Sequence, residues 1–195
     1  MEPDRPPKIQ AAFRSVQDSE NTSYLLSDTL HILRINGAWT TFAMANGGER
    51  MLERWGRGRS LLDAIPEPLR EVHRTQLLRT LATGEPWELD YECSSADVYR
   101  ELRMMALPVA GRFITVTHSP RVGRPHDRIR HAADDERYLQ DGIIRMCVYC
   151  RRVEVAGGKA SRWDWVPDYV TAMPMNVSHG MCPICTVFHT SAFTS

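Results

Sequence analysis

Two Cys-x-x-Cys pairs near the C-terminus constrain this chain more than any other feature. They stand as Cys147-Val148-Tyr149-Cys150 and Cys182-Pro183-Ile184-Cys185. Zinc prefers four ligands in a tetrahedron, and two such turns can each present two thiolates to one ion. The C-terminal segment of about 50 residues that holds these cysteines buries too little apolar surface to fold alone, and metal binding supplies the missing free energy of folding. We therefore expect a structural zinc ion bound by Cys147, Cys150, Cys182 and Cys185.

The interpretation of the cysteines depends on the compartment. The chain opens with Met1-Glu2-Pro3-Asp4-Arg5-Pro6-Pro7, which lacks the apolar stretch of a signal peptide, and no apolar run is long enough to span a bilayer. We expect a cytoplasmic protein without a membrane partner. Cytosolic thiols are kept reduced, so paired Cys-x-x-Cys spacings there indicate metal or redox chemistry and not a disulfide framework.

Two further readings of the same site stay open. Under oxidation the pairs could release metal and form disulfides, which would make the protein a redox or metal sensor. His179, three residues before Cys182, could replace a cysteine as ligand, although with four thiols present we expect it to support the site from outside. His189 is expected on the surface of the last helix. A four-thiolate site has no open position for a substrate, so we expect no enzyme.

Charge gives no global preference for a partner. Lys plus Arg and Asp plus Glu are equal at 24 each, so nucleic acid is not an expected partner. A local basic run exists, but Asp127 and the acidic stretch Asp134-Asp135-Glu136 interrupt it. We interpret it as a solvated connector. The run comprises Arg121, Arg124, Arg128, Arg130 and Arg137.

The first two thirds of the chain alternate short apolar runs with helical patterns. Two strands are expected around residues 24–26 and 31–35, then helices over 37–46, 49–55, 60–64 and 66–83, and then strands over 87–94, 99–109 and 112–118. Asn36 is expected to cap the first of these helices. This order predicts an α+β fold in which helices cover one face of a five-stranded antiparallel sheet.

The pattern divides the chain into four parts. Residues 1–22 are polar and proline-rich and are expected to form a flexible tail with a short helix around residues 11–16, and residues 23–119 form the α+β domain. Residues 120–142 are a linker followed by a charged connector helix over 126–141. Residues 143–195 form a small zinc-ribbon-like module that holds the four cysteines.

Within residues 23–119 the chain resembles a PAS domain. Residues 33–39, Leu-Arg-Ile-Asn-Gly-Ala-Trp, look like the family's second strand and first helix, and residues 82–87, Ala-Thr-Gly-Glu-Pro-Trp, look like the end of its long helix. Residues 113–118, Phe-Ile-Thr-Val-Thr-His, resemble its final strand. The resemblance implies a sensory or docking domain that dimerises in many proteins, binds an unknown small molecule if any, and signals to a protein partner such as a histidine kinase or regulator.

The C-terminal part is similar to a segment that follows PAS or receiver domains in bacterial signalling proteins. That segment reads Cys-x-x-Cys-Lys-x-Ile and then Ser-His-Gly-Ile-Cys-Pro-x-Cys. Here residues 147–153 and 178–185 match it, with Arg151, Val153 and Met181 as conservative replacements. The resemblance implies a non-enzymatic signal-transduction protein that acts on a partner in trans.

His73 carries the alternative of a haem-based gas sensor. It lies in Pro66-Glu67-Pro68-Leu69-Arg70-Glu71-Val72-His73, where the resemblance places the iron-ligating histidine of oxygen-sensing PAS domains. Many PAS domains without haem also have a polar residue there. The only cysteine of this half, Cys93, is expected on a strand, which excludes the helical cysteine motif of flavin photoreceptors.

Overall fold

The computed structural model describes residues 7–46, 54, 56–109, 112–157 and 161–193. The chain divides into two compact units. Unit 1 comprises Met1–Asp90 and Arg103–Pro120, and unit 2 comprises Tyr91–Leu102 and Arg121–Ser195. Strands β3 (Trp87–Glu92), β4 (Val98–Val109) and β5 (Phe113–Pro125) contribute residues to both units.

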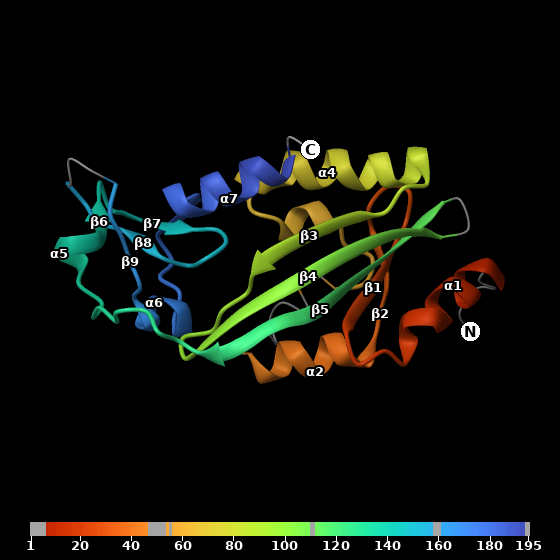
Figure 1. Cartoon of the computed structure of the whole chain (residues 1–195), viewed down its shortest axis with the longest axis horizontal. Coiled ribbons are helices and arrows are strands. Elements are labelled where there is room, and N and C mark those ends of the chain that lie inside the picture. The colour runs from red at the N-terminus through yellow and green to blue at the C-terminus, as the bar shows by residue number, and fades with distance from the viewer. Residues whose placement is uncertain (1–6, 47–53, 55, 110–111, 158–160, 194–195) are drawn as a thin grey trace. The chain divides into compact units, whose positions relative to one another are not determined.

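A five-stranded sheet in the order β2-β1-β5-β4-β3 is the framework of unit 1 (Figure 1). Strands β1 (Thr22–Leu26) and β2 (Ile32–Ile35) pair antiparallel, and β1 also pairs antiparallel with β5. The predicted α+β class and the five strands are confirmed. Leu25, Leu26, Ile32, Ile114 and Val116 are among the fully buried side chains of the sheet.

The helices between β2 and β3 begin and end where the sequence predicts. Helix α2 (Gly37–Ala45) follows Asn36, whose side-chain oxygen accepts from the Trp39 amide, and this confirms the predicted cap. The 3-10 helix η1 (Leu61–Ala64) follows a similar cap at Ser60. Helix α4 (Glu67–Thr83) ends at Gly84, which adopts a positive φ of 78° that glycine tolerates without strain. The helix expected over residues 49–55 lies outside the described residues, apart from residue 54.

The tail expected over residues 1–22 is ordered over residues 7–17, where the short helix predicted around residues 11–16 is confirmed and is longer than expected. Residues Pro7–Gln17 form helix α1, and Ala12 and Phe13 are buried against Leu25 of β1. Tyr24 contacts Trp39 of α2 on the other face, because neighbouring residues of a strand point to opposite faces. Helices therefore cover both faces of the sheet near β1, where the sequence predicted helices on one face. Packing of the apolar side chains of Ala12, Phe13 and Val16 against the sheet stabilises helix α1, although the residues around them are polar.

Unit 2 contains a second small sheet in the order β10-β7-β8-β9, with β6 also paired to β7. Tyr138, Ile144, Met146, Val153, Val166 and Tyr169 form its apolar core. The strands are β6 (Leu139–Gln140), β7 (Ile143–Cys147), β8 (Val153–Glu154), β9 (Trp163–Asp164) and β10 (Val177–Gly180). The helices are α5 (Asp135–Tyr138), α6 (Pro167–Thr171) and α7 (Pro183–Phe193).

The connector helix expected over residues 126–141 is wrong. Strand β5 continues to Pro125, and only the four residues of α5 are helical. The β6–β7 hairpin follows, and its turn residues Asp141 and Gly142 have φ of 51° and 77°. An Asp-Gly pair suits a turn that needs positive φ at both positions, so this pair ends the helix early.

Candidate metal centre

Parallel pairing of β7 with β10 brings the two cysteine motifs together. Met146 pairs with His179 and Cys147 pairs with Gly180. Beyond this register the Val148 amide donates to the Gly180 carbonyl at 2.8 Å. Parallel strands end at the same edge of a sheet, and here β7 ends at Cys147, the first residue of its motif, while Cys182 follows the end of β10 by two residues. The sheet therefore brings together in space two motifs that are more than thirty residues apart in the sequence.

The four sulfur atoms form one compact cluster. All four Sγ atoms of Cys147, Cys150, Cys182 and Cys185 lie within 4.8 Å of one another, and Cys150 Sγ is 3.6 Å from Cys182 Sγ. A zinc tetrahedron with Zn–S bonds of about 2.3 Å places its sulfurs about 3.8 Å apart. No disulfide joins them. The spacing is that of thiolates around one ion, so the donor set fits a metal.

Backbone amides and a helix end favour thiolates at this position. The Cys182 amide donates to Cys147 Sγ at 3.4 Å, and the Cys185 amide donates to Cys182 Sγ at 3.5 Å. Helix α7 begins at Pro183, inside the second motif, which places the positive end of the helix beside the sulfurs. N–H donors and a helix N-terminus both lower the cost of a thiolate.

The cluster cannot hold several negative charges unaided. Hydrogen bonds from the thiols of Cys150, Cys182 and Cys185 lower the pKa of Cys147. Hydrogen bonding to that sulfur raises the pKa of Cys185, and burial raises it further. All four side chains are buried. A divalent cation offsets the repulsion between the thiolates, because the sulfurs that must lose their protons bind it directly.

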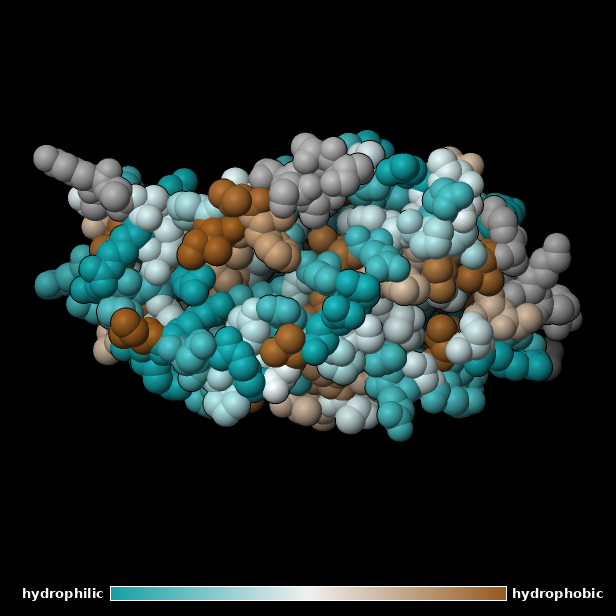
Figure 2. All heavy atoms as spheres, viewed as in Figure 1, coloured by the Kyte–Doolittle hydropathy of each residue, from teal (hydrophilic) through white to brown (hydrophobic). Residues whose placement is uncertain are grey.

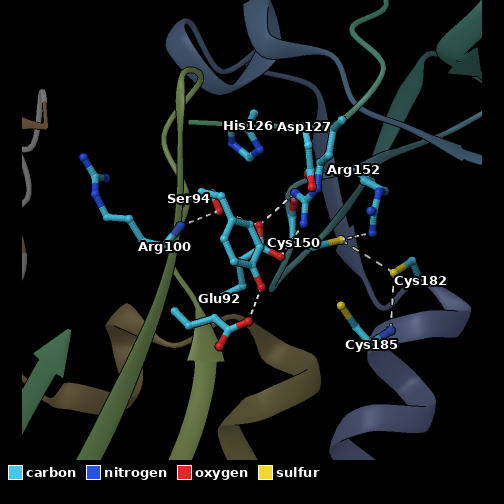
Figure 3. Close-up of polar contacts among 12 residues, drawn as sticks. Glu92, Ser94, Arg100, His126, Asp127, Cys150, Arg152, Cys182 and Cys185 are labelled. Atoms are coloured by element: carbon cyan, nitrogen blue, oxygen red, sulfur yellow. Dashed lines mark hydrogen bonds and ion pairs between the residues drawn. The ribbon is translucent and has the colours of Figure 1, made fainter. Parts of the chain in front are cut away.

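Figure 3 shows that an arginine also lies near the sulfurs. Arg152 Nη1 is 3.7 Å from Cys150 Sγ, and the two cysteines Cys150 and Cys182 face each other (Figure 3). The residue after Cys150, Arg151, has a positive φ of 59°, and its amide donates to the Cys147 carbonyl at 3.1 Å. This turn closes the first motif. Gly180, just before the second motif, adopts no positive φ.

The structure places the two histidines of the module differently from the sequence expectation. His179 lies half-buried in β10 and is not part of the four-residue cluster found among the described residues. Its supporting role stays a prediction. His189 was expected on the surface, and that expectation is wrong: only 2% of it is exposed, and its ring stacks on Tyr149 at 3.5 Å. His189 follows Cys185 by one helical turn, so it faces the same side of α7.

His73, the candidate haem ligand, lies on α4 in unit 1. Its Nδ1 is 2.9 Å from the Leu69 carbonyl, and its ring contacts Trp87 edge to face at 5.2 Å. Burial lowers the pKa of His73, so the imidazole is neutral near pH 7. Haem ligation stays a prediction, which the visible spectrum of the purified protein checks.

A further histidine that is partly buried, His118, was not found by sequence reasoning. Its ring stacks on Tyr24 with centroids 5.6 Å apart, and its Nε2 is 3.4 Å from the Tyr24 hydroxyl. Burial, together with the charge of His73, lowers the pKa of His118 to about 4. The sequence signal was available, because His118 follows the apolar strand residues that line the sheet and keeps their alternation.

We expect His118 to make unit 1 sensitive to acid. Its folded pKa of about 4 lies below its ordinary value of 6.5, so the unfolded chain binds the extra proton. The stabilisation is complete above about pH 6.5 and is lost as the pH falls toward 4, with a change of about 2 kcal/mol between pH 7 and pH 5. Urea unfolding of wild type and His118→Gln at both pH values measures it. His31→Gln, at an exposed position, is the matched control for the exchange of a histidine for glutamine.

Among the described residues, none of the helices has the length and apolar character that crossing a bilayer requires. No family model matches the chain, and no curated protein matches it. The structure is similar to several solved PAS domains. The PAS domain of BvgS from Bordetella pertussis has a TM-score of 0.47 and 16% identity, covering 60% of this chain and 88% of that one.

Two other solved structures give the same picture. The RpfR quorum-sensing receptor PAS domain of Cronobacter turicensis, in complex with C12:0, has a TM-score of 0.41 and 13% identity, covering 55% of this chain and 99% of that one. The PAS domain of an HTR-like protein from Haloarcula marismortui has a TM-score of 0.39 and 14% identity, covering 60% and 100%. The chain is thus similar to PAS domains from several sources, at low identity.

Proposed function

We propose that this protein is a non-enzymatic, cytoplasmic signal-transduction protein in which a PAS-type sensory domain is joined to a module held by one structural zinc ion. The observation that carries the proposal is the cluster of four buried sulfurs, all within 4.8 Å of one another. Four thiolates complete the coordination of zinc and leave no position for substrate. The role of the ion is then to hold the fold of the module.

Zinc is the metal that the donor set favours. Four sulfur ligands in a small, closed, buried site suit zinc or an iron–sulfur centre, and calcium or magnesium would require oxygen ligands. An iron–sulfur cluster also contains inorganic sulfide, which widens the cysteine cage. Sulfurs that already lie as close as 3.6 Å, at Cys150 and Cys182, favour a single ion. In this role Cys147, Cys150, Cys182 and Cys185 are the zinc ligands.

A protein partner is supported by the surface of α7. Figure 2 shows hydrophobic side chains gathered over this helix, and Ile184, Val187 and Phe188 are 66%, 72% and 58% exposed. Ile184 lies inside the second cysteine motif, and Val187 and Phe188 follow it at helical spacing, so zinc binding sets where this surface begins. Apolar side chains exposed together are typical of a protein contact. The partner would be a histidine kinase, a regulator or a second copy of the chain.

Burial of the sulfurs distinguishes a permanent site from a redox switch. Cys147, Cys150, Cys182 and Cys185 are 0%, 1%, 1% and 8% exposed, whereas redox-sensing cysteines are solvent-accessible. We expect freshly purified protein to contain one zinc per chain and to retain it in mild peroxide. The test is metal analysis and thiol counting before and after peroxide. Rapid zinc loss with disulfide formation would establish the switch instead.

A further inference from the structure

One arginine, Arg128, connects the first cysteine motif to the hairpin formed by β3 and β4. Its Nη1 and Nη2 atoms donate to the two carboxylate oxygens of Glu92 at 2.8 and 2.6 Å, and Nη1 also donates to the Cys150 carbonyl at 3.1 Å. The side chains of the ion pair are only 11% and 12% exposed. All three residues belong to unit 2. Figure 3 shows Glu92 and Cys150 converging on one place.

The surroundings of Arg128 hold its guanidinium in this orientation. Its Cζ lies 5.4 Å from the ring centroid of Tyr99, on the hairpin, and 5.0 Å from that of Trp165, in the module. Glu92 also accepts from Ser94, which in turn accepts from the Arg100 amide (Figure 3). The planar fork of arginine suits this paired contact, and a lysine ammonium cannot reproduce it.

The contact reaches the backbone of a residue that carries one of the four sulfurs. Cys150 presents its carbonyl to Arg128, and the left-handed Arg151 follows it directly. Groups that hydrogen-bond to metal-binding residues fix the orientation of the ligand atoms, and their loss weakens metal binding by about 10 to 100-fold. An exposed arginine would add little, but this ion pair is largely shielded from solvent and bidentate.

We propose that Arg128 couples the metal centre to the β3–β4 hairpin, so that metal loading orders residues 91–102 and a change in this hairpin alters metal affinity. The proposal rests on the proposed zinc site. The two effects are reciprocal, because a coupling free energy between two sites acts equally in both directions. Strands β3 and β4 also belong to the five-stranded sheet and contribute residues to both units.

The first measurement is the zinc affinity of the full chain, by competition with a coloured chelator. Arg128→Lys should weaken zinc binding about tenfold, because the charge remains and the paired contact is lost. Arg130→Lys is the matched control. Arg130 also pairs with the hairpin, at Asp97, but the two side chains are 56% and 79% exposed, so the affinity should not change. If Arg128→Lys does not fold, Glu92→Gln tests the same contact by removing the charge of the carboxylate partner.

The second measurement is hydrogen exchange of residues 91–102 with and without zinc. In wild type we expect zinc to slow exchange in this segment, and in Arg128→Lys we expect the segment to lose that response while the cysteine motifs keep theirs. If wild type and Arg128→Lys bind zinc equally well, and zinc does not change exchange of the hairpin in wild type, the coupling is overturned and the zinc site still stands. Wild-type protein that binds no zinc would overturn both proposals.

Discussion

Replacing Cys182 by serine is expected to abolish metal binding and unfold the module formed by residues 143–193. Cys182 Sγ lies 3.6 Å from Cys150 Sγ and accepts from the Cys185 amide, so its loss breaks both halves of the cluster. Structural zinc contributes about 10 kcal/mol to the folding of such a module. Apolar burial alone cannot replace this, because the apolar core of the module is small: one cluster of buried residues, Tyr138, Ile144, Met146, Val153, Val166 and Tyr169, lies at its centre.

The measurement is metal content combined with hydrogen exchange across residues 143–193. Wild type treated with a strong chelator should reproduce the exchange pattern of Cys182→Ser. Cys93→Ser is the matched control, since Cys93 is the one cysteine of the chain outside the cluster. It should keep one zinc and native exchange. Retention of zinc by Cys182→Ser, with unchanged exchange, would contradict the four-cysteine assignment.

Asn36→Ala is expected to destabilise unit 1 by about 4 kcal/mol. The side chain is 3% exposed and makes five hydrogen bonds to the backbone, so truncation leaves buried donors and acceptors without partners. Loss of the helix cap contributes about 1 kcal/mol of this. The Oδ1 atom accepts from the Ser23 and Trp39 amides, and Nδ2 donates to the carbonyls of Val16, Ser19 and Asn21.

Asn36→Asp separates the cap from the other contacts. It keeps an acceptor for the two amides but places a second oxygen where the amide nitrogen faced three carbonyl oxygens, so it should destabilise at least as much as alanine. Asn46→Ala is the control, because Asn46 is exposed and makes one side-chain bond, to the Phe42 carbonyl. Urea unfolding measures all three. A loss of only about 1 kcal/mol in Asn36→Ala would mean that the cap is its whole contribution.

Asn36 also illustrates how far the sequence alone could lead. Its position before an apolar helical pattern predicted one of its five bonds, the cap. The short helix predicted around residues 11–16 gave no sign that the carbonyls of Val16 and Ser19 would meet the Asn36 side chain. Local signals therefore predicted the strands and caps of unit 1, whereas contacts between distant segments could not be predicted.

The module gives the same lesson. Spacing alone predicted that four cysteines would meet, but only the parallel register of β7 and β10 explains how. Five arginines of the basic run looked alike in the sequence, and Arg128 became buried because Glu92, far away in the chain, lies opposite it. The Asp141-Gly142 pair is typical of a turn, but the prediction of a helix over residues 126–141 did not take this signal into account.

X-ray absorption at the zinc edge of the purified full chain tests the central claim most directly. The account predicts one zinc per chain with four sulfur neighbours at about 2.3 Å and no nitrogen or oxygen neighbour. A nitrogen neighbour would show that a histidine such as His179 binds the ion in place of one of the four cysteines. Absence of bound metal in reduced protein would contradict the account outright.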